Sequence, residues 1–292
     1  MTKKQVTLTI GAQASKSFTD AMADIDDQTA PKEIVGFTSL SWSPPQLGTV
    51  TFDHGGHQIH FPHTFSALGT SWPLYPDEGI SIINLRTGIS ATEYIRHEEA
   101  WKNWQALLMH VQENGWQVSI SEYDPRIRGL ERYNYIMSED AAFSSIDPAY
   151  PLSYGQWSNL LEKKYIKAFF YQDGVYLNLV LSQNPVSADE LAAKKLDLNL
   201  AEWGQYLVEV EFSTVRYSKR NAMLSTLPRN DDDTETELKI RQNLPFYWQE
   251  LKQRYAKERE QSELKLIQQG YKIDTSYQSP DITPYLQSKP VF

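Results

Sequence analysis

A glycine pair between two alternating segments constrains the fold of this chain more than any other feature. Gly55-Gly56 lies between residues 48–54 (GTVTFDH) and residues 57–62 (HQIHFP), in which apolar and polar side chains alternate. Such a pair predicts a β-hairpin with a two-residue turn, because glycine tolerates the positive φ that both turn positions require. The chain must therefore contain antiparallel strands here.

Four of the six histidines lie in or beside this hairpin, at positions 54, 57, 60 and 63. Histidine is the commonest protein metal ligand, so the spacing raises the question of a metal site. With the turn fixed, His54 opposes His57 on one face of the hairpin, and His60 opposes Thr51 on the other. Because catalytic zinc usually needs three protein ligands, we expect neither a metal site nor a cofactor.

Two long helices are predicted further along the chain. Residues 92–114 carry apolar side chains at three- and four-residue spacing, which is typical of a helix with one buried face, and Gly115 can end it. A charged helix is predicted over residues 234–269. Pro245 should bend or break it, because proline disfavours helical geometry in the preceding residue and lacks an amide donor.

Further strand signals lie in the second half of the chain. Asp173-Gly174 predicts the turn of a second hairpin, in which Leu177, Leu179 and Leu181 share one face. Residues 204–217 (GQYLVEVEFSTVRY) alternate as a half-buried antiparallel strand does. The inward residues are Val208, Val210 and Phe212, and the outward residues are Leu207, Glu209 and Glu211.

These elements predict an α+β fold in which antiparallel sheets carry long helices packed on one face. The pattern divides the chain into an N-terminal half, residues 1–146, and a C-terminal half, residues 147–292, which ends in a long helix, a strand and an irregular tail. After Gly115 and after Gly270, an aromatic residue, a serine and a proline follow at equal offsets. This correspondence is compatible with two similar halves, but helix ends commonly carry such residues, and both explanations stay open.

Composition narrows the classes of function. A net charge of -9 and a pI near 5.2 argue against nucleic-acid binding, which needs clustered lysine and arginine. The absence of cysteine excludes disulfides, thiolate chemistry and cysteine-based zinc sites. No apolar run approaches the roughly 20 residues that cross a bilayer, and no signal peptide opens the sequence, so we expect no transmembrane segment.

The sequence carries no catalytic motif. His97 precedes two glutamates, but Trp101 stands where the helical zinc motif of metalloproteases requires a second histidine. Neither a G-x-S-x-G elbow nor a phosphate-binding glycine loop occurs. A triad assembled from distant segments stays open, since triads are recognised by geometry. We therefore expect a protein without catalytic activity.

Two groups of residues are candidates for contacting a partner. The aromatic group lies in proline-containing loops, where such side chains either pack internally or anchor an interface. The acidic group either stabilises the start of a helix or steers a basic partner. The candidate partner-binding residues are Trp42, Trp72, Tyr75, Asp231, Asp232 and Asp233.

Three parts of the chain together resemble a known family. They are residues 108–127 (LMHVQENGWQVSISEYDPRI), residues 146–160 (IDPAYPLSYGQWSNL) with 169–181 (FFYQDGVYLNLVL), and residues 266–282 (LIQQGYKIDTSYQSPDI). These segments resemble lipoprotein-type immunity proteins of Proteobacteria, which are encoded beside type VI secretion system effectors. The likeness covers about half of the chain.

The resemblance implies a function. It implies an antitoxin that binds and occludes a cognate effector toxin, often a lipase, in the periplasm, where the family is anchored as lipoproteins. The sequence lacks the lipid-modified cysteine and signal of that family, which leaves a cytoplasmic location open. A periplasmic glycan- or peptidoglycan-binding module, with exposed tryptophans lining a groove, and a hydrolase with an unrecognised site are the alternatives.

Overall fold

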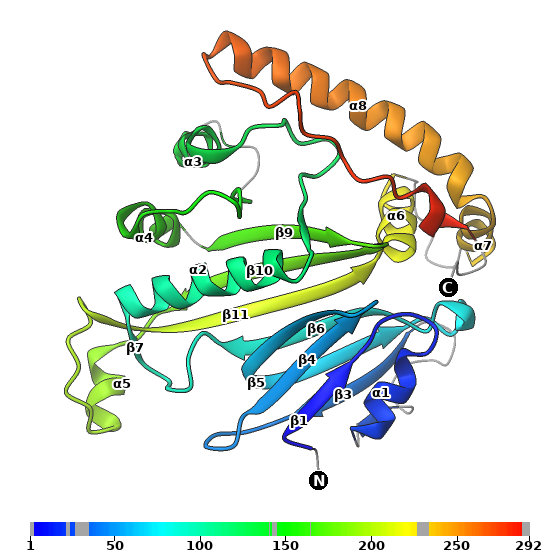
Figure 1. Ribbon diagram of the computed structural model, residues 1–292. Coiled ribbons are helices and arrows are strands. Elements are labelled where there is room, and N and C mark those ends of the chain that lie inside the picture. The colour runs from blue at the N-terminus through cyan, green and yellow to red at the C-terminus, as the bar shows by residue number, and fades with distance from the viewer. Residues whose placement is uncertain are drawn as a thin grey trace.

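The computed structural model describes residues 3–21, 24–26, 35–139, 141, 145–163, 165–226 and 234–287. It has the predicted α+β class, with a mostly antiparallel sheet at its centre (Figure 1). The main path of the sheet runs β1-β4-β5-β6-β11-β10-β9-β8, while β3 and β2 extend from β5 and β7 pairs with β11. The strands are β1 Gln5–Leu8, β2 Asp24–Asp26, β3 Gly36–Ser41, β4 Gly48–His54, β5 His57–Ser71, β6 Ile80–Gly88, β7 Ile95–Arg96, β8 Gln117–Val118, β9 Ile166–Gln172, β10 Val175–Asn184 and β11 Trp203–Thr214.

The predicted hairpins are confirmed. Gly55 and Gly56 have φ values of 61° and 88°, and they join β4 to β5. The register is the expected one: His54 opposes His57, and Thr51 opposes His60. The second hairpin turns at Asp173-Gly174 and pairs β9 with β10.

The two hairpins belong to two similar meanders. Strands β4, β5 and β6 follow one another in the sheet, and so do β9, β10 and β11. The last strands of the two meanders, β6 and β11, pair with each other in the antiparallel sense. The strand order is therefore mirrored about this pair, and one continuous sheet crosses the predicted boundary between the halves. That the halves arose by duplication stays a prediction.

One long helix begins later than predicted, and the other is broken where predicted. The first long helix, α2, begins at His97 and not at residue 92, because Ile95 and Arg96 pair with β11 as strand β7. The charged helix is broken at Asn243, beside Pro245, into two pieces, as predicted. The helices are α1 Ala14–Asp20, α2 His97–Glu113, α3 Gly129–Met137, α4 Tyr154–Lys163, α5 Ala188–Ala193, α6 Val215–Leu224, α7 Thr234–Gln242 and α8 Leu244–Gln268, with 3-10 turns η1 Pro76–Glu78 and η2 Thr283–Leu286.

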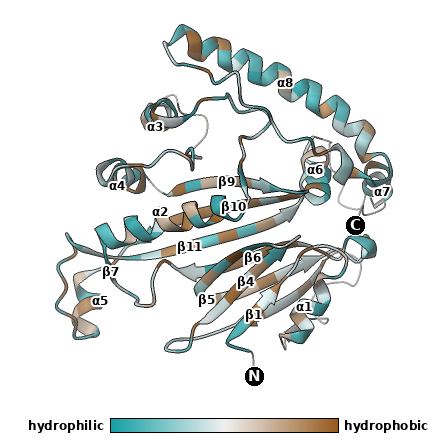
Figure 2. Ribbon diagram, viewed as in Figure 1, coloured by the Kyte–Doolittle hydropathy of each residue, from teal (hydrophilic) through white to brown (hydrophobic). Residues whose placement is uncertain are grey.

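The main core lies between α2, α4 and one face of the sheet. Alternate residues of β10 and β11, such as Leu179 and Val210, are buried against these helices together with Trp104 and Trp157. Figure 2 shows the matching alternation of hydrophobic and polar residues along the strands. In the centre of the core Phe212 stacks on the ring of Phe52, with 3.5 Å between ring centroids.

A second cluster forms where α6, α7, α8 and η2 meet the ends of β9 and β10. It contains Tyr171, Val215, Trp248 and Leu286. The long helix α8 contacts α6, α7 and η2, and it stands away from the centre of the sheet (Figure 1). The predicted strand after Gly270 does not form among the described residues, because this segment bonds to the irregular segment before α3, as when Asp274 N–H donates to the Arg126 carbonyl (2.7 Å).

A buried carboxylate joins the second cluster to the N-terminal half. Glu78, in η1, accepts two hydrogen bonds from Arg220 Nη1 on α6, at 2.7 and 2.6 Å. Arg216 and Arg241 also approach the Glu78 carboxylate, both at 3.4 Å. The side chains of Glu78 and Arg220 are each only 3% exposed. Arg216 and Arg241 also pair with Asp77, so removal of the Glu78 charge would leave Arg220 as the uncompensated buried partner.

We expect Glu78→Gln to lower the free energy of unfolding by about 3 to 5 kcal/mol, because the buried Arg220 would lose its counter-ion. Urea unfolding followed by circular dichroism measures the loss. Glu202→Gln is the control, since Glu202 pairs with Arg96 on the surface and such pairs contribute about 1 kcal/mol or less. Equal losses of unfolding free energy in the two variants would contradict the role of Glu78 as a stabilising buried counter-ion.

Both predicted glycine caps are confirmed, and they offer a matched comparison. Gly115 and Gly270 have φ values of 89° and 91°, and each ends its helix with the same pair of hydrogen bonds from successive amides. A Cβ on Gly115 would lie 2.5 Å from Nδ1 of His57, whereas a Cβ on Gly270 meets nothing within 4 Å.

Gly270→Ala should therefore cost only the strain of a left-handed residue, about 1 to 2 kcal/mol. Gly115→Ala should cost about 1 to 3 kcal/mol more, because the His57 ring must also move. Chemical denaturation of the two variants measures the difference. Similar losses would show that His57 does not pack tightly on this helix end.

Candidate functional site

The face of the sheet opposite the main core carries a hollow of about 470 Å³. Its residues alternate along the strands with those that enter the core, so they point to the other side. The volume is within the range of about 300 to 1,000 Å³ that is usual for ligand sites. The polar and apolar side chains that line it from this face are Ser66, Leu68, Asn84, Arg86, Asn178, Val180, Glu209 and Glu211.

Three polar residues cross the centre of the hollow in one row. Glu211 on β11 is paired with Asn84 of β6 on one side and with Asn178 of β10 on the other. Directly opposed residues have Cβ atoms about 4.5 to 5.5 Å apart, so the three side chains lie together. Glu211 is an outward residue of its strand, as predicted from the sequence.

The Glu211 carboxyl is partly buried and has no counter-ion among the described residues. Burial raises its pKa above the ordinary value of 4.5, and neither a hydrogen bond nor a nearby cation offsets this effect. The ion pair on this face joins Arg86 to Glu209 at the solvent-exposed rim, with 3.7 Å between Nε and Oε1. The central carboxyl therefore lacks, within the described part of the chain, the compensation that its neighbour has.

Asn178 adds a second uncompensated group. Its Oδ1 atom is fully buried and has no hydrogen-bond partner within the described residues. Buried side-chain acceptors are hydrogen-bonded in the large majority of cases, so an orphan acceptor is a feature that calls for an explanation. In the hollow it lies on the strand next to Glu211.

An aromatic pair stands near this row. Trp72 stacks on Tyr217 of α6, with 4.7 Å between ring centroids and 27° between planes. Burial, and then the negative charge of Glu211, raise the pKa of Tyr217, so the phenol lies within electrostatic range of that carboxyl. Trp72, a candidate from the sequence, thus lies near a polar site that the sequence did not reveal.

The other sequence candidates have different surroundings. Trp42 donates through Nε1 to the Lys3 carbonyl (2.8 Å), and its ring covers Gly48 so closely that a side chain there would collide with it. Tyr75 is 1% exposed, with Arg220 3.8 Å above its ring, so it offers no surface to a partner. Trp42 and Tyr75 therefore pack within the molecule. The remaining candidates, Asp231, Asp232 and Asp233, lie outside the described residues.

The hairpin histidines bond to separate parts of the molecule. His54 donates through Nε2 to the Asp173 carbonyl (2.9 Å), and His57 donates through Nδ1 to the Asn114 carbonyl (2.8 Å). The backbone N–H of His60 donates to Nε2 of His110 on α2 (3.4 Å). Among the residues with described positions, no group of three or more metal-ligating side chains is arranged to hold an ion.

His60, His63 and His110 line a separate hollow of about 320 Å³ beside α2. Burial lowers the pKa of His63, and burial together with the neighbouring His60 lowers that of His110. Both therefore favour the uncharged form, and the contact from the His60 amide uses the lone pair of His110. This arrangement positions α2 on the hairpin.

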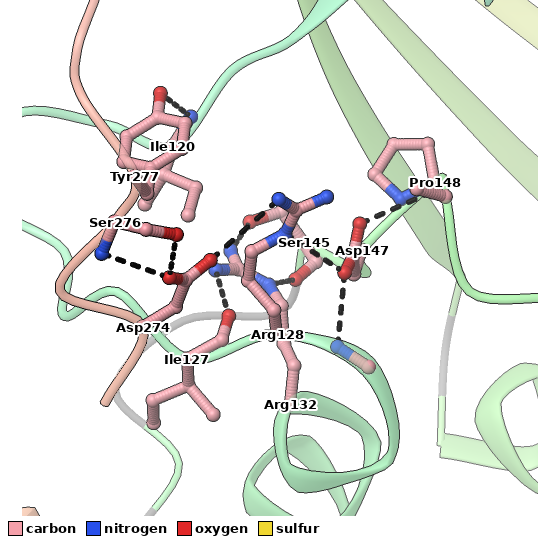
Figure 3. A network of polar contacts seen from close by, with 12 residues as sticks. Ile120, Ile127, Arg128, Arg132, Ser145, Asp147, Pro148, Asp274, Ser276 and Tyr277 are labelled. Atoms are coloured by element: carbon pink, nitrogen blue, oxygen red, sulfur yellow. Dashed lines mark hydrogen bonds and ion pairs between the residues drawn. The ribbon is translucent and has the colours of Figure 1, made fainter. Parts of the chain in front are cut away.

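A buried polar network surrounds Arg132, which is 1% exposed (Figure 3). Arg132 donates to the carbonyl and hydroxyl oxygens of Ser145, both at 2.5 Å. Asp147 accepts from Arg128 Nε (3.2 Å), and Arg128 Nη1 lies 3.6 Å from Asp274 in the C-terminal segment. These charged groups are paired with one another, so the network fastens α3 to the C-terminal segment and is less suited to bind a ligand.

Comparisons of the chain with protein-family models, with curated proteins and with solved structures give no match. No helix among the described residues has both the length and the apolar character that crossing a membrane requires. The inference of function therefore rests on the geometry of the sheet face and on the sequence resemblance.

Glu211→Gln tests the environment of the central carboxyl. Because the folded protein binds this proton more tightly than the unfolded chain, the associated stability is complete below pH 4.5 and is lost as pH rises through the raised pKa. The neutral amide avoids this loss, so the variant should unfold at higher urea concentration than the wild type at about pH 7.

The difference in unfolding free energy between the Glu211→Gln variant and the wild type should shrink as pH falls below 4.5. Glu209→Gln, at the exposed rim of the same strand, should change stability by no more than about 0.5 kcal/mol. A gain in stability of the Glu211→Gln variant that does not depend on pH would contradict desolvation as its cause.

Proposed function

We propose that this chain is a binding protein that docks a protein partner on the open face of its sheet, around the hollow at Glu211. The observation that carries the proposal is the partly buried Glu211 carboxyl at the centre of that hollow, which is flanked by Asn84 and Asn178 and has no counter-ion among the described residues. A partner that supplies hydrogen-bond donors would compensate this carboxyl.

The open face combines an apolar centre with a polar rim, as protein interfaces do. Leu68 and Val180 provide partly buried apolar surface within the hollow, and Arg86 and Glu209 form a polar rim. Interfaces commonly combine an apolar centre with a polar, solvent-exposed rim. The sheet beneath is fixed by the main core, so little conformational entropy would be lost on binding.

The resemblance to lipoprotein-type immunity proteins supports a particular class of partner. We propose that the partner is a type VI secretion effector, such as a lipase, and that the chain inhibits it by occlusion in the periplasm without performing catalysis itself. The net charge of -9 supports binding to a basic surface, since opposite charges accelerate association. A glycan groove lined by Trp42 and Trp72 has less support, because the Trp42 ring packs on Gly48.

The proposal requires a secreted toxin encoded beside this gene, and co-expression with that toxin tests it. We expect the chain to restore growth and to elute with the toxin in size-exclusion chromatography. Leu68→Arg should weaken the complex by at least about tenfold, because it places bulk and charge in the hollow. Met109→Arg is the matched control, since Met109 is 56% exposed on α2, which packs on the other face of the sheet.

Thermal unfolding should first show that both variants are folded. No complex with the toxin, or equal weakening by the two variants, would contradict docking at the open face.

A further inference from the structure

The central row of the hollow presents acceptors that lack donors. Glu211 brings two carboxylate oxygens with no cation near them among the described residues, and Asn84 and Asn178 are paired with it on the two neighbouring strands. Within the described residues, Arg86 is the cation that lines the hollow, and it pairs with Glu209 at the rim. A ligand that fits this row must therefore bring both positive charge and several N–H groups.

We propose that the hollow is a receptor for the guanidinium group of an arginine side chain from the protein partner. The inference rests on the proposed function, because it names the chemistry by which that partner is recognised. The guanidinium would donate two parallel hydrogen bonds to the Glu211 carboxylate, beside Asn178, whose buried Oδ1 it does not reach. The amide of Asn84, on the other side of Glu211, completes the polar wall.

The geometry favours a guanidinium over an ammonium group. Guanidinium carries five N–H donors in a planar fork that matches a carboxylate with two bonds, and donors remain for an adjacent amide oxygen. It is also weakly hydrated and stacks on aromatic rings, and the Trp72–Tyr217 pair lies within electrostatic range of Glu211. A lysine ammonium lacks the planar fork and is more strongly hydrated.

A metal ion fits the row less well. No group of three or more His, Cys, Asp or Glu side chains in the described part of the chain is placed to ligate one. The hollow, at about 470 Å³, is also far larger than an ion and has room for a whole side chain. Its opening on the sheet surface suits a side chain that projects from a partner.

Small probes test this chemistry without the partner. The full chain is titrated with N-acetyl-arginine amide while NMR follows the side-chain amides of Asn84 and Asn178. We expect these signals to shift and saturate, with affinity at least about fivefold higher than for N-acetyl-lysine amide or for the neutral N-acetyl-citrulline amide. Glu211→Gln should reduce the arginine affinity by about tenfold or more. Equal affinity for the three probes would overturn the inference.

An arginine placed within the hollow provides a second measurement. Val180 opposes Glu209 and is the diagonal neighbour of Glu211, within reach of a long side chain. Val180→Arg should raise the melting temperature by about 2 °C or more, whereas Val180→Met, of similar length and no charge, should not. The gain should vanish when Glu211→Gln is added. A gain that persists in this double variant would be assigned to Glu209 and would count against the proposed receptor.

The outcomes separate this inference from the proposed function. If the toxin binds the wild type and Glu211→Gln equally well, the chain docks its partner but the guanidinium receptor is wrong. If the arginine probe binds selectively while no complex with the toxin forms, the chemistry of the hollow stands and the proposed partner is wrong.

Discussion

The antiparallel pairing of β6 with β11 is the interaction on which the rest of the structure depends. It joins the two meanders. The register of this one pair of strands also determines which side chains lie on each face of the sheet. Ile83 and Phe212 oppose each other toward the main core, while the next pair, Asn84 and Glu211, faces the hollow. A slip of one residue would exchange the faces and drive Glu211 into the core, so burial on one side fixes the register on the other.

Two glutamates illustrate how differently the fold treats a desolvated carboxyl. Glu78 is surrounded by three arginines from α6 and α7, and its burial is part of the attachment between the halves. Glu211 is less buried, and no arginine in the described part of the chain pairs with it. A folded protein usually pairs its buried charges or keeps them neutral, so the contrast is informative. The first carboxyl serves the architecture, and the second is better explained by something that arrives from outside.

Much of the sheet could be predicted because its determinants are local. The glycine turn at Gly55-Gly56 fixed the register of β4 and β5, and alternation along β11 assigned Glu209 and Glu211 to the outer face. The start of α2 was misplaced because Ile95 and Arg96 pair with a strand more than 100 residues later, as the contact of Gly204 with Ile95 shows. Such long-range pairing leaves no signal in a local window.

The hollow could not be predicted for a related reason. Asn84 and Asn178 belong to different meanders, and only the strand order brings them to either side of Glu211. One local clue exists: asparagine is depleted in strands, yet each of these residues interrupts an otherwise apolar segment. Trp72 was a candidate because it is an aromatic residue in a proline-containing loop. Its neighbour Tyr217 lies on α6, which comes close to Trp72 only in the folded molecule.

The topology also bears on how the chain acquires its structure. Strand β8 comes from the first half of the sequence but lies beyond β9 at the edge of the second meander, and Glu78 meets Arg220 across 142 positions. Neither half can bury its apolar face alone, and contacts of such sequence separation slow folding. Synthesis must therefore pass well beyond the middle of the chain before a native sheet can close, and the molecule should acquire its structure as one cooperative unit.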